Sequence, residues 1–197
     1  PLPLKDLLQE VSTTTNGFGH FESLNLAALT GTDTSPEFAL TPLQQAYCFG
    51  RKSYGGKKAE GSKTYYEFTV DQLDTDRMEK AINHLVVQHG MLRTVVAAKQ
   101  LSQTLRSETP WFQLEEVKLA MPFAAGAKEI DRMRASYLAR QIDEASWPLF
   151  AAMITRFSDD RSVLHFIFDS LIVDGQSLSL FFTQLFETYA ANDTQVG

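Results

Sequence analysis

The sequence predicts an α+β domain in which helices pack against a mixed or largely antiparallel sheet. Two observations lead to this class. Helix and strand patterns follow one another as helix, strand, helix, two strands, helix, two strands, helix. A short polar turn, Ser158 to Arg161, joins two apolar strands and indicates a hairpin. With 197 residues and 44% hydrophobic composition, the chain is long enough to bury a core of its own.

The first predicted helix has a complete start signal. Thr41 is placed as the N-cap, Pro42 at the first helical position, and Gln44 three residues after the cap. We expect this helix to end near Arg51. The next segment, residues 64–70, is rich in aromatic and β-branched side chains and is typical of a strand.

A second helix is expected from about Asp74 to His89, with Gly90 closing it as a helix-ending glycine. Five residues fall on one face of this helix at spacings of three and four: Met78, Ile82, Leu85, Val86 and His89. A strand over Leu92 to Ala98 follows. Its expected partner is the segment Trp111 to Val117, with the polar stretch Gln100 to Thr109 connecting the two.

A third helix is expected over Lys128 to Ala145, followed by two buried strands, Leu149 to Phe157 and Ser162 to Phe168. The last helix, Ser177 to Ala190, is strongly apolar. Its apolar residues lie on more than one side, which indicates a second packing partner that this chain lacks.

The composition excludes several classes of function. Lys and Arg number 18 and Asp and Glu 24, and the net charge of −6 argues against a general nucleic-acid-binding protein. The single cysteine, Cys48, excludes an internal disulfide and a CxxC zinc site, and we expect it to be a small buried hydrophobe. The histidines are too scattered for a metal site, and no apolar run reaches the roughly 20 residues of a membrane span.

The segment Asp169 to Ser177 places two carboxylates around an apolar tetrapeptide, between a buried strand and a helix. Local chemistry explains one of them, because Asp174 with Gly175 makes a turn, and Asp174 or Ser177 caps the helix. Asp169 differs, because it ends a strand that we expect to be buried on both faces, where a carboxylate needs a partner. The segment is therefore both a helix start and a candidate site.

Two further segments have recognisable patterns. Phe38 to Arg51 is similar to the motif FPLTxxQxAYxxGR, with Ala39 where the motif has Pro. His89 to Arg93 resembles the motif RHxMLR, with Gln88 in the place of the first Arg. From the residues alone, the first segment is explained as a capped helix, and the second as a helix end that leads into a strand.

The remaining motifs complete the pattern. Asp169 to Ser177 matches DxxxxDxxS at every fixed position, and Trp147 to Phe150 resembles WPLF. Over residues 38 to 190, the four motifs together resemble the N-terminal half of a heterocyclization domain of non-ribosomal peptide synthetases. These domains are relatives of condensation domains, so the resemblance implies a chloramphenicol-acetyltransferase-like lobe.

The third motif separates subclasses of this superfamily. Ordinary condensation domains and acetyltransferases resemble one another in carrying HHxxxDG at this place. When Asp174 and Gly175 are aligned with the DG of this motif, Asp169 takes the place of the first His and Ser170 that of the second. By resemblance, the second His is the one that those enzymes use near the acceptor nucleophile. A serine cannot replace an imidazole base at neutral pH. The resemblance therefore favours heterocyclization over His-dependent acyl transfer.

The resemblance also implies a reaction and its partners. Such domains condense an acyl group on an upstream carrier protein with a Cys, Ser or Thr on a downstream carrier, and cyclodehydrate the product to a thiazoline or oxazoline. Asp169 and Asp174 are then the catalytic candidates. The implied partners are the upstream and downstream peptidyl carrier proteins. No directly bound cofactor is expected, and the phosphopantetheine arms belong to those carriers.

The roles of individual residues can be divided on physical grounds. We expect Asp174 to pair with Arg93, because a guanidinium binds a carboxylate in bidentate fashion, and the pair to hold the active-site loop. Asp169 is then the better candidate to face the reaction channel, where it either orients the acceptor or holds the loop. Ser177 is expected to cap the last helix and His89 to support the end of the second.

Three more residues are candidates for the substrate tunnel. Tyr47 and Arg51 either line the tunnel mouth or pack the first helix. His165 alternates with buried strand neighbours, so it either lines a cleft or lies in the core or at the sheet edge.

The expected organisation is a linker or lead-in over residues 1–37 and an N-terminal lobe over 38–197. The first residue, Pro1, predicts a start inside a longer reading frame or after processing. By resemblance, a similar C-terminal lobe follows and carries the Thr and Asp used in cyclodehydration, so we expect this chain to be inactive alone. A cytoplasmic location follows from the family and the lack of targeting segments.

Two alternatives stay open. One is a catalytically silent module that binds a carrier protein or the complementary lobe, and the other is an ordinary condensation-type acyltransferase, disfavoured by Ser170. An exposed apolar face is expected where the C-terminal lobe belongs, and a homodimer through that face is a further expected state.

Overall fold

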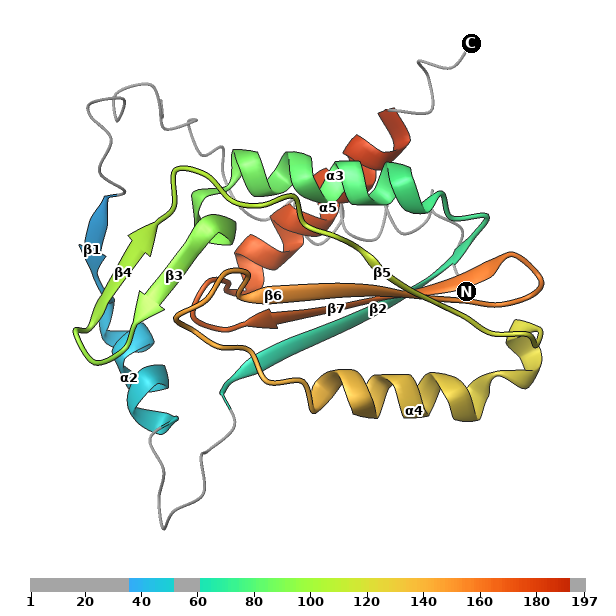
Figure 1. The fold of residues 1–197 in the computed structure, drawn as a ribbon, viewed down its shortest axis with the longest axis horizontal. Coiled ribbons are helices and arrows are strands. Elements are labelled where there is room, and N and C mark those ends of the chain that lie inside the picture. The colour runs from blue at the N-terminus through green and yellow to red at the C-terminus, as the bar shows by residue number, and fades with distance from the viewer. Residues whose placement is uncertain (1–35, 52–60, 192–197) are drawn as a thin grey trace.

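The computed structural model describes residues 36–51 and 61–191 of the chain. They form two sheets and four α-helices (Figure 1). The predicted α+β class with a mixed or antiparallel sheet is confirmed. Nearly all of the predicted lead-in, 1–37, lies outside the described residues.

The elements follow the predicted order with a few changes. The helices are α2 (Pro42–Gly50), α3 (Thr75–Gln88), α4 (Ala127–Leu138) and α5 (Gly175–Ala191), with 3₁₀ turns at Gly90–Arg93 and Phe123–Ala125. The strands are β1 (Glu37–Ala39), β2 (Lys63–Asp71), β3 (Thr94–Ala97), β4 (Ser102–Leu105), β5 (Glu115–Lys118), β6 (Phe150–Arg156) and β7 (Arg161–Asp169).

The central sheet has the strand order β2-β7-β6-β5. β6 and β7 form the predicted antiparallel hairpin, β2 pairs with β7 antiparallel, and β5 pairs with β6 in parallel. A second, antiparallel sheet has the order β1-β4-β3 and lies beside α2, at the left of Figure 1. The alignment of Lys63 with Asp169 places the end of β7 opposite the start of β2.

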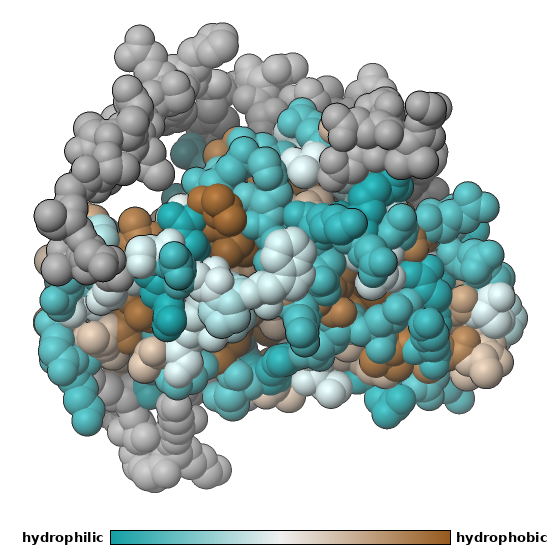
Figure 2. Space-filling view, turned by 45° about the horizontal axis from the view of Figure 1, so that its top comes forward, coloured by the Kyte–Doolittle hydropathy of each residue, from teal (hydrophilic) through white to brown (hydrophobic). Residues whose placement is uncertain are grey.

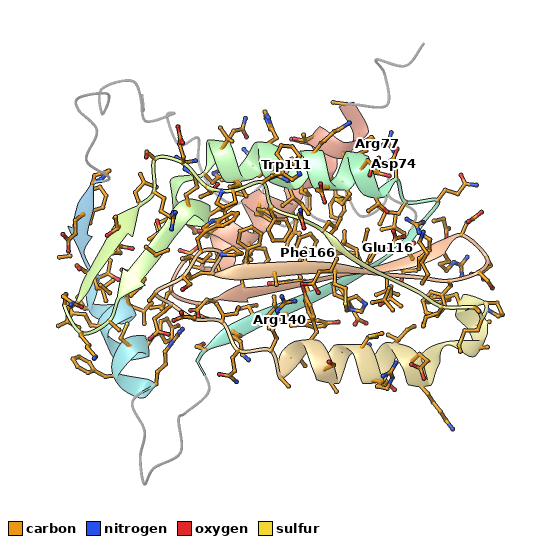
Figure 3. The ribbon with its side chains drawn as sticks, in the orientation of Figure 1. Asp74, Arg77, Trp111, Glu116, Arg140 and Phe166 are labelled. Carbon is orange, nitrogen blue, oxygen red and sulfur yellow. The ribbon has the colours of Figure 1, made fainter. Side chains whose placement is uncertain are left out.

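Helices cover both faces of the central sheet, with α3 and α5 on one and α4 on the other (Figure 1). The α5 face is packed with phenylalanines: Phe166 and Phe168 of β7 meet Phe181 and Phe182 of α5 with ring centroids 5.1 to 6.1 Å apart. Figure 3 shows Phe166 between the sheet and these helices. Such ring contacts add to the stabilisation that apolar burial provides.

The expectation that α5 lacks a packing partner is wrong. Leu178, Leu185 and Tyr189 are buried together with the phenylalanines of α5, because α5 packs against the sheet on one side and against α3 on another. Leu180 is the large apolar side chain of α5 that stays exposed, at 49%. On the face of the molecule shown in Figure 2, hydrophobic residues lie in separate areas between hydrophilic ones.

The predicted partner of β3 is also wrong. β3 pairs with β4, which lies inside the stretch expected to be a polar connection. Residues 111–114 are bound by α3 instead: the Asn83 amide bonds both N and O of Phe112 at 2.8 Å, and Glu79 accepts from Leu114 N at 2.8 Å. The chain then enters the central sheet as β5.

The third helix ends at Leu138, earlier than the predicted Ala145. Beyond it, backbone groups find partners outside a helix, since Val96 N donates to Glu144 O at 2.7 Å. Asp143 accepts from Ser146 Oγ at 2.8 Å, which stabilises a turn before Pro148.

Gly90 does not close α3 in the expected way. His89 is the C-cap and has an extended backbone, and Gly90 begins the 3₁₀ turn that leads to β3. The N-terminal signal of α2 is confirmed in full: Thr41 N donates to Gln44 Oε1 at 2.9 Å and Gln44 N donates to Thr41 Oγ1 at 3.3 Å.

Candidate active-site loop

The candidate site is the loop 169–174, which joins β7 to α5. Asp169 is the last residue of β7 and is only 1% exposed. Its Oδ1 accepts from Leu171 N at 2.9 Å, and its backbone O accepts from Ile172 N at 3.1 Å. These bonds make a tight turn whose apolar residues, Leu171 and Ile172, are buried in the core.

Arg51, at the C-cap of α2, forms an ion pair with Asp169 Oδ1. The Arg51 side chain is buried, and its Nη1 lies 3.6 Å from Glu144 Oε2. A Cβ on Gly61 would lie 2.8 Å from Arg51 Cζ, so the backbone at this glycine covers the guanidinium closely. The pair joins α2 to the loop and desolvates both charges, which makes each partner necessary to the other.

Asp174 has an exposed, local role. Its Oδ1 accepts from both N and Oγ of Ser177 at 2.7 Å, and these bonds lower the pKa of the Asp174 carboxyl. Asp174 is therefore the N-cap of α5, and Ser177 donates to it. The expected cap from Asp174 is confirmed, and the expectation that Ser177 is the cap is wrong, because Ser177 lies inside the first turn of α5 and donates to Asp174.

The predicted ion pair between Asp174 and Arg93 is wrong. Arg93 donates to the carbonyls of Val86 and Val87 at the end of α3 and to Arg106 O at 3.2 Å. The last carbonyls of a helix have no partner within the helix and carry partial negative charge, so they attract a guanidinium that is close in sequence. Asp169, and not Asp174, pairs with an arginine, and that arginine is Arg51 at the C-cap of α2.

His165 and His89 are bonded to residues outside the loop. His165 is fully buried, bonded through Nδ1 to Tyr65 Oη at 2.6 Å and through Nε2 to Thr155 Oγ1 at 3.0 Å. It therefore lies in the core and does not line a cleft. His89 Nε2 bonds Gln184 Oε1 and links the end of α3 to α5, consistent with a structural role.

The two tunnel candidates of this region lie on α2 and at its C-cap, and their place at a tunnel mouth stays a prediction. Arg51 is buried in its ion pair, and Tyr47 is half-buried against the main core cluster. Cys48 is buried on the same helix, as predicted. Over the described part of the chain, no group of three or more His, Cys, Asp or Glu side chains could hold a metal ion.

Sequence reasoning missed the role of Gln44. Beyond the cap, its side-chain Nε2 donates to Leu171 O at 2.8 Å, inside the candidate loop. The preceding residue of the same loop, Ser170, bonds Ser62 through both its backbone N, at 3.0 Å, and its Oγ, at 2.9 Å. No imidazole lies in the loop. What the arrangement provides is a rigid turn held by α2 rather than a free base.

A sequence profile described as "Condensation domain" matches residues 35–196. Pyochelin synthetase PchF of Pseudomonas aeruginosa is 33% identical over 149 residues, which are 73% of this chain and 8% of the synthetase. The chain thus spans less than a tenth of the length of that synthetase.

Two solved structures are similar to this chain. The cyclization-docking bidomain of EpoB from Sorangium cellulosum has a TM-score of 0.71 and 21% identity, over 95% of this chain and 38% of that one. The non-ribosomal peptide synthetase FmoA3 has a TM-score of 0.64 and 25% identity, over 82% of this chain and 16% of that one. In the described residues, no helix is both long enough and apolar enough to cross a membrane.

Proposed function

We propose that this chain, which belongs to the condensation-domain family, is the N-terminal lobe of a heterocyclization domain in a non-ribosomal peptide synthetase. In this proposal, the whole domain condenses a carrier-bound acyl group with a carrier-bound Cys, Ser or Thr and then forms a thiazoline or oxazoline. The sequence similarity to a pyochelin synthetase and the fold similarity to a cyclization domain both support it.

One observation carries the choice of heterocyclization over ordinary acyl transfer. The loop 169–174 has a carboxylate and a hydroxyl, Asp169 and Ser170, where related acyl transferases have two histidines. The nearest imidazole along β7, His165, is bonded at both nitrogens and buried, so it is not available to an acceptor amine. A reaction that needs an imidazole base in this loop is therefore disfavoured.

The proposed reaction has two stages. The acceptor amine first attacks the thioester carbonyl, and the upstream phosphopantetheine thiol leaves. The side-chain thiol or hydroxyl then attacks the new amide carbonyl, and the carbonyl oxygen leaves as water when the ring C=N bond forms. In this lobe, Arg51 and Asp169 hold the loop beside the reaction channel, and Asp174 starts α5. The groups for dehydration are proposed to belong to the C-terminal lobe.

Reconstitution with loaded carrier proteins tests this function. We would compare this chain with a protein extended through the next lobe, and measure the intact mass of the downstream carrier. The extended protein is expected to give a condensed product that then loses one water, and the isolated chain to give neither. A downstream carrier loaded with Ala is the control, because Ala can accept the acyl group but has no side-chain nucleophile for ring closure. Amide formation by the chain alone would contradict the requirement for a second lobe.

One observation favours the second candidate, a silent docking module. The outward face of α2 is apolar, with Leu43 at 61% and Phe49 at 49% exposed, and Phe38 of β1 is exposed as well. A face of this kind is typical of a surface that is covered by another protein or lobe. If neither protein reacts but this chain still binds a loaded carrier, the docking function replaces the catalytic one.

A further inference from the structure

The Gln44 side-chain amide uses all of its hydrogen-bonding capacity. Its Oε1 accepts from Thr41 N at 2.9 Å and from Gln103 Nε2 at 3.3 Å. Its Nε2 donates to Leu171 O at 2.8 Å and to Gln103 Oε1 at 3.0 Å. An amide has two donor hydrogens and two acceptor lone pairs, so this buried side chain has no capacity left over.

These bonds hold both backbone polar groups of one loop residue, Leu171. Leu171 N donates to Asp169 Oδ1, and Asp169 is held by Arg51. Leu171 O accepts from Gln44. Gln44 and Arg51 are seven residues apart on α2 and its C-cap, or about two helical turns, so both face the loop.

We propose that Gln44 is a positioning residue that sets the conformation of the 169–174 loop through Leu171 O. The N-cap needs an acceptor from this side chain and the loop needs a donor, and an amide supplies both. A carboxylate would keep the cap but would place an oxygen against the Leu171 carbonyl. The consequence for catalysis rests on the proposed function, whereas the positioning of the loop does not.

The test is Gln44→Glu in the 197-residue chain. At about pH 8 the ionised carboxylate cannot donate, and we expect the protection of the Leu171 amide against hydrogen exchange to fall roughly tenfold, relative to the Ile167 amide of β7. At about pH 5.5 the carboxyl, whose pKa is raised by burial beside a carbonyl, gains a proton and donates to Leu171 O. Protection should then return close to the wild-type ratio, with intrinsic exchange rates corrected for pH.

Two variants make this result specific. Thr41→Ala removes the hydroxyl that caps α2 without touching Leu171, so the Leu171 to Ile167 protection ratio should stay at the wild-type value. Gln44→Met removes the donor without adding charge, so the ratio should fall at both pH values. If the buried carboxylate of Gln44→Glu prevents folding at about pH 8, Gln44→Met by itself still tests the role of the donor. An unchanged ratio in Gln44→Met, or an equal loss in Thr41→Ala, would overturn the proposal.

An activity measurement separates this proposal from the proposed function. In the extended protein, Gln44→Glu should give roughly tenfold less condensed product per unit time at about pH 8, with recovery at about pH 5.5. If wild-type extended protein makes no product but the exchange results hold, the proposed function fails and the positioning role stands. If wild-type protein is active and the exchange of Leu171 is unaffected by the variants, the positioning role fails alone.

Discussion

The two aspartates of the candidate loop lie in opposite environments. Asp169 is buried against Arg51, whereas Asp174 is exposed and bonded to Ser177. A buried ion pair is costly to break because the remaining charge stays desolvated, whereas an N-cap carboxylate can be replaced by another capping side chain. The same residue type therefore has two different energetic roles within one motif.

This difference predicts unequal costs for two isosteric substitutions. Asp169→Asn should lower the free energy of unfolding by about 3 kcal/mol, because the Arg51 charge stays buried with only the more distant Glu144 near it. Asp174→Asn should cost less than about 1 kcal/mol, because asparagine is an equally good N-cap. Urea denaturation of both variants measures the comparison. Equal costs would contradict the assignment of Asp169 as the buried partner.

At the scale of elements, α4 is attached to the sheet through a polar network as well as through apolar contacts. Arg134 of α4 bonds both carboxylate oxygens of Glu67, at 2.6 and 2.9 Å. Glu67 accepts from Tyr65 Oη at 2.8 Å, so the hydrogen between Tyr65 and His165 comes from His165 Nδ1. The Nε2 of His165 then accepts from Thr155, and the neutral imidazole is fully bonded.

Burial lowers the pKa of His165 to about 4, which predicts acid sensitivity. The unfolded chain binds this proton near pH 6.5 and the folded state only near 4, so folding stability is complete above about pH 6.5. It falls as the pH decreases from there toward 4, by roughly 3 kcal/mol in total. Unfolding free energies measured from about pH 7.5 down to 5 should follow this slope, above the range in which carboxyls titrate.

The control for this prediction is a pair of variants. His165→Gln should flatten the pH dependence between about pH 5 and 6.5, whatever its effect on stability at neutral pH. His84→Gln, at an exposed position on α3, should leave the slope unchanged. If wild type and His165→Gln have the same slope, the buried neutral imidazole is not the cause.

At the scale of the whole molecule, the outward face of α2 exposes two large apolar side chains, Leu43 and Phe49. α2 carries no acidic residue in its first turn and no basic one in its last, and its buried side chains are Gln44 and Cys48. The helix thus directs the polar side chain of Gln44 toward the loop and apolar side chains toward solvent. This inversion of the usual pattern is expected of a surface that another protein, another domain or a second copy of the chain covers.

The isolated chain is therefore expected to self-associate as its concentration rises. Sedimentation velocity over a range of concentrations should show dimer, and Leu43→Glu with Phe49→Glu should shift the population to monomer, because charge on the face opposes its burial. Val87→Glu is the matched control, since Val87 is 71% exposed but lies on α3. A chain that is monomeric at every concentration would count against the homodimer and leave the second lobe as the expected cover.

Features that depend on neighbours in sequence were determined by the sequence itself. The cap of α2 uses Thr41 and Gln44, three residues apart, and the cap of α5 uses Asp174 and Ser177 in the same spacing. The β6–β7 hairpin likewise depends on the short turn between its strands. Such contacts form from adjacent residues, so their residue types and spacing predict them.

The tertiary structure alone decided which distant groups meet. Arg51 reaches Asp169 across 118 positions, whereas Arg93 donates to the carbonyls at the end of the preceding helix, α3. Asn83 binds Phe112 and so directs that segment to α3 rather than to β3. A guanidinium or an amide accepts many partners of the same chemistry, and only the packing of the elements brings one of them within bonding distance.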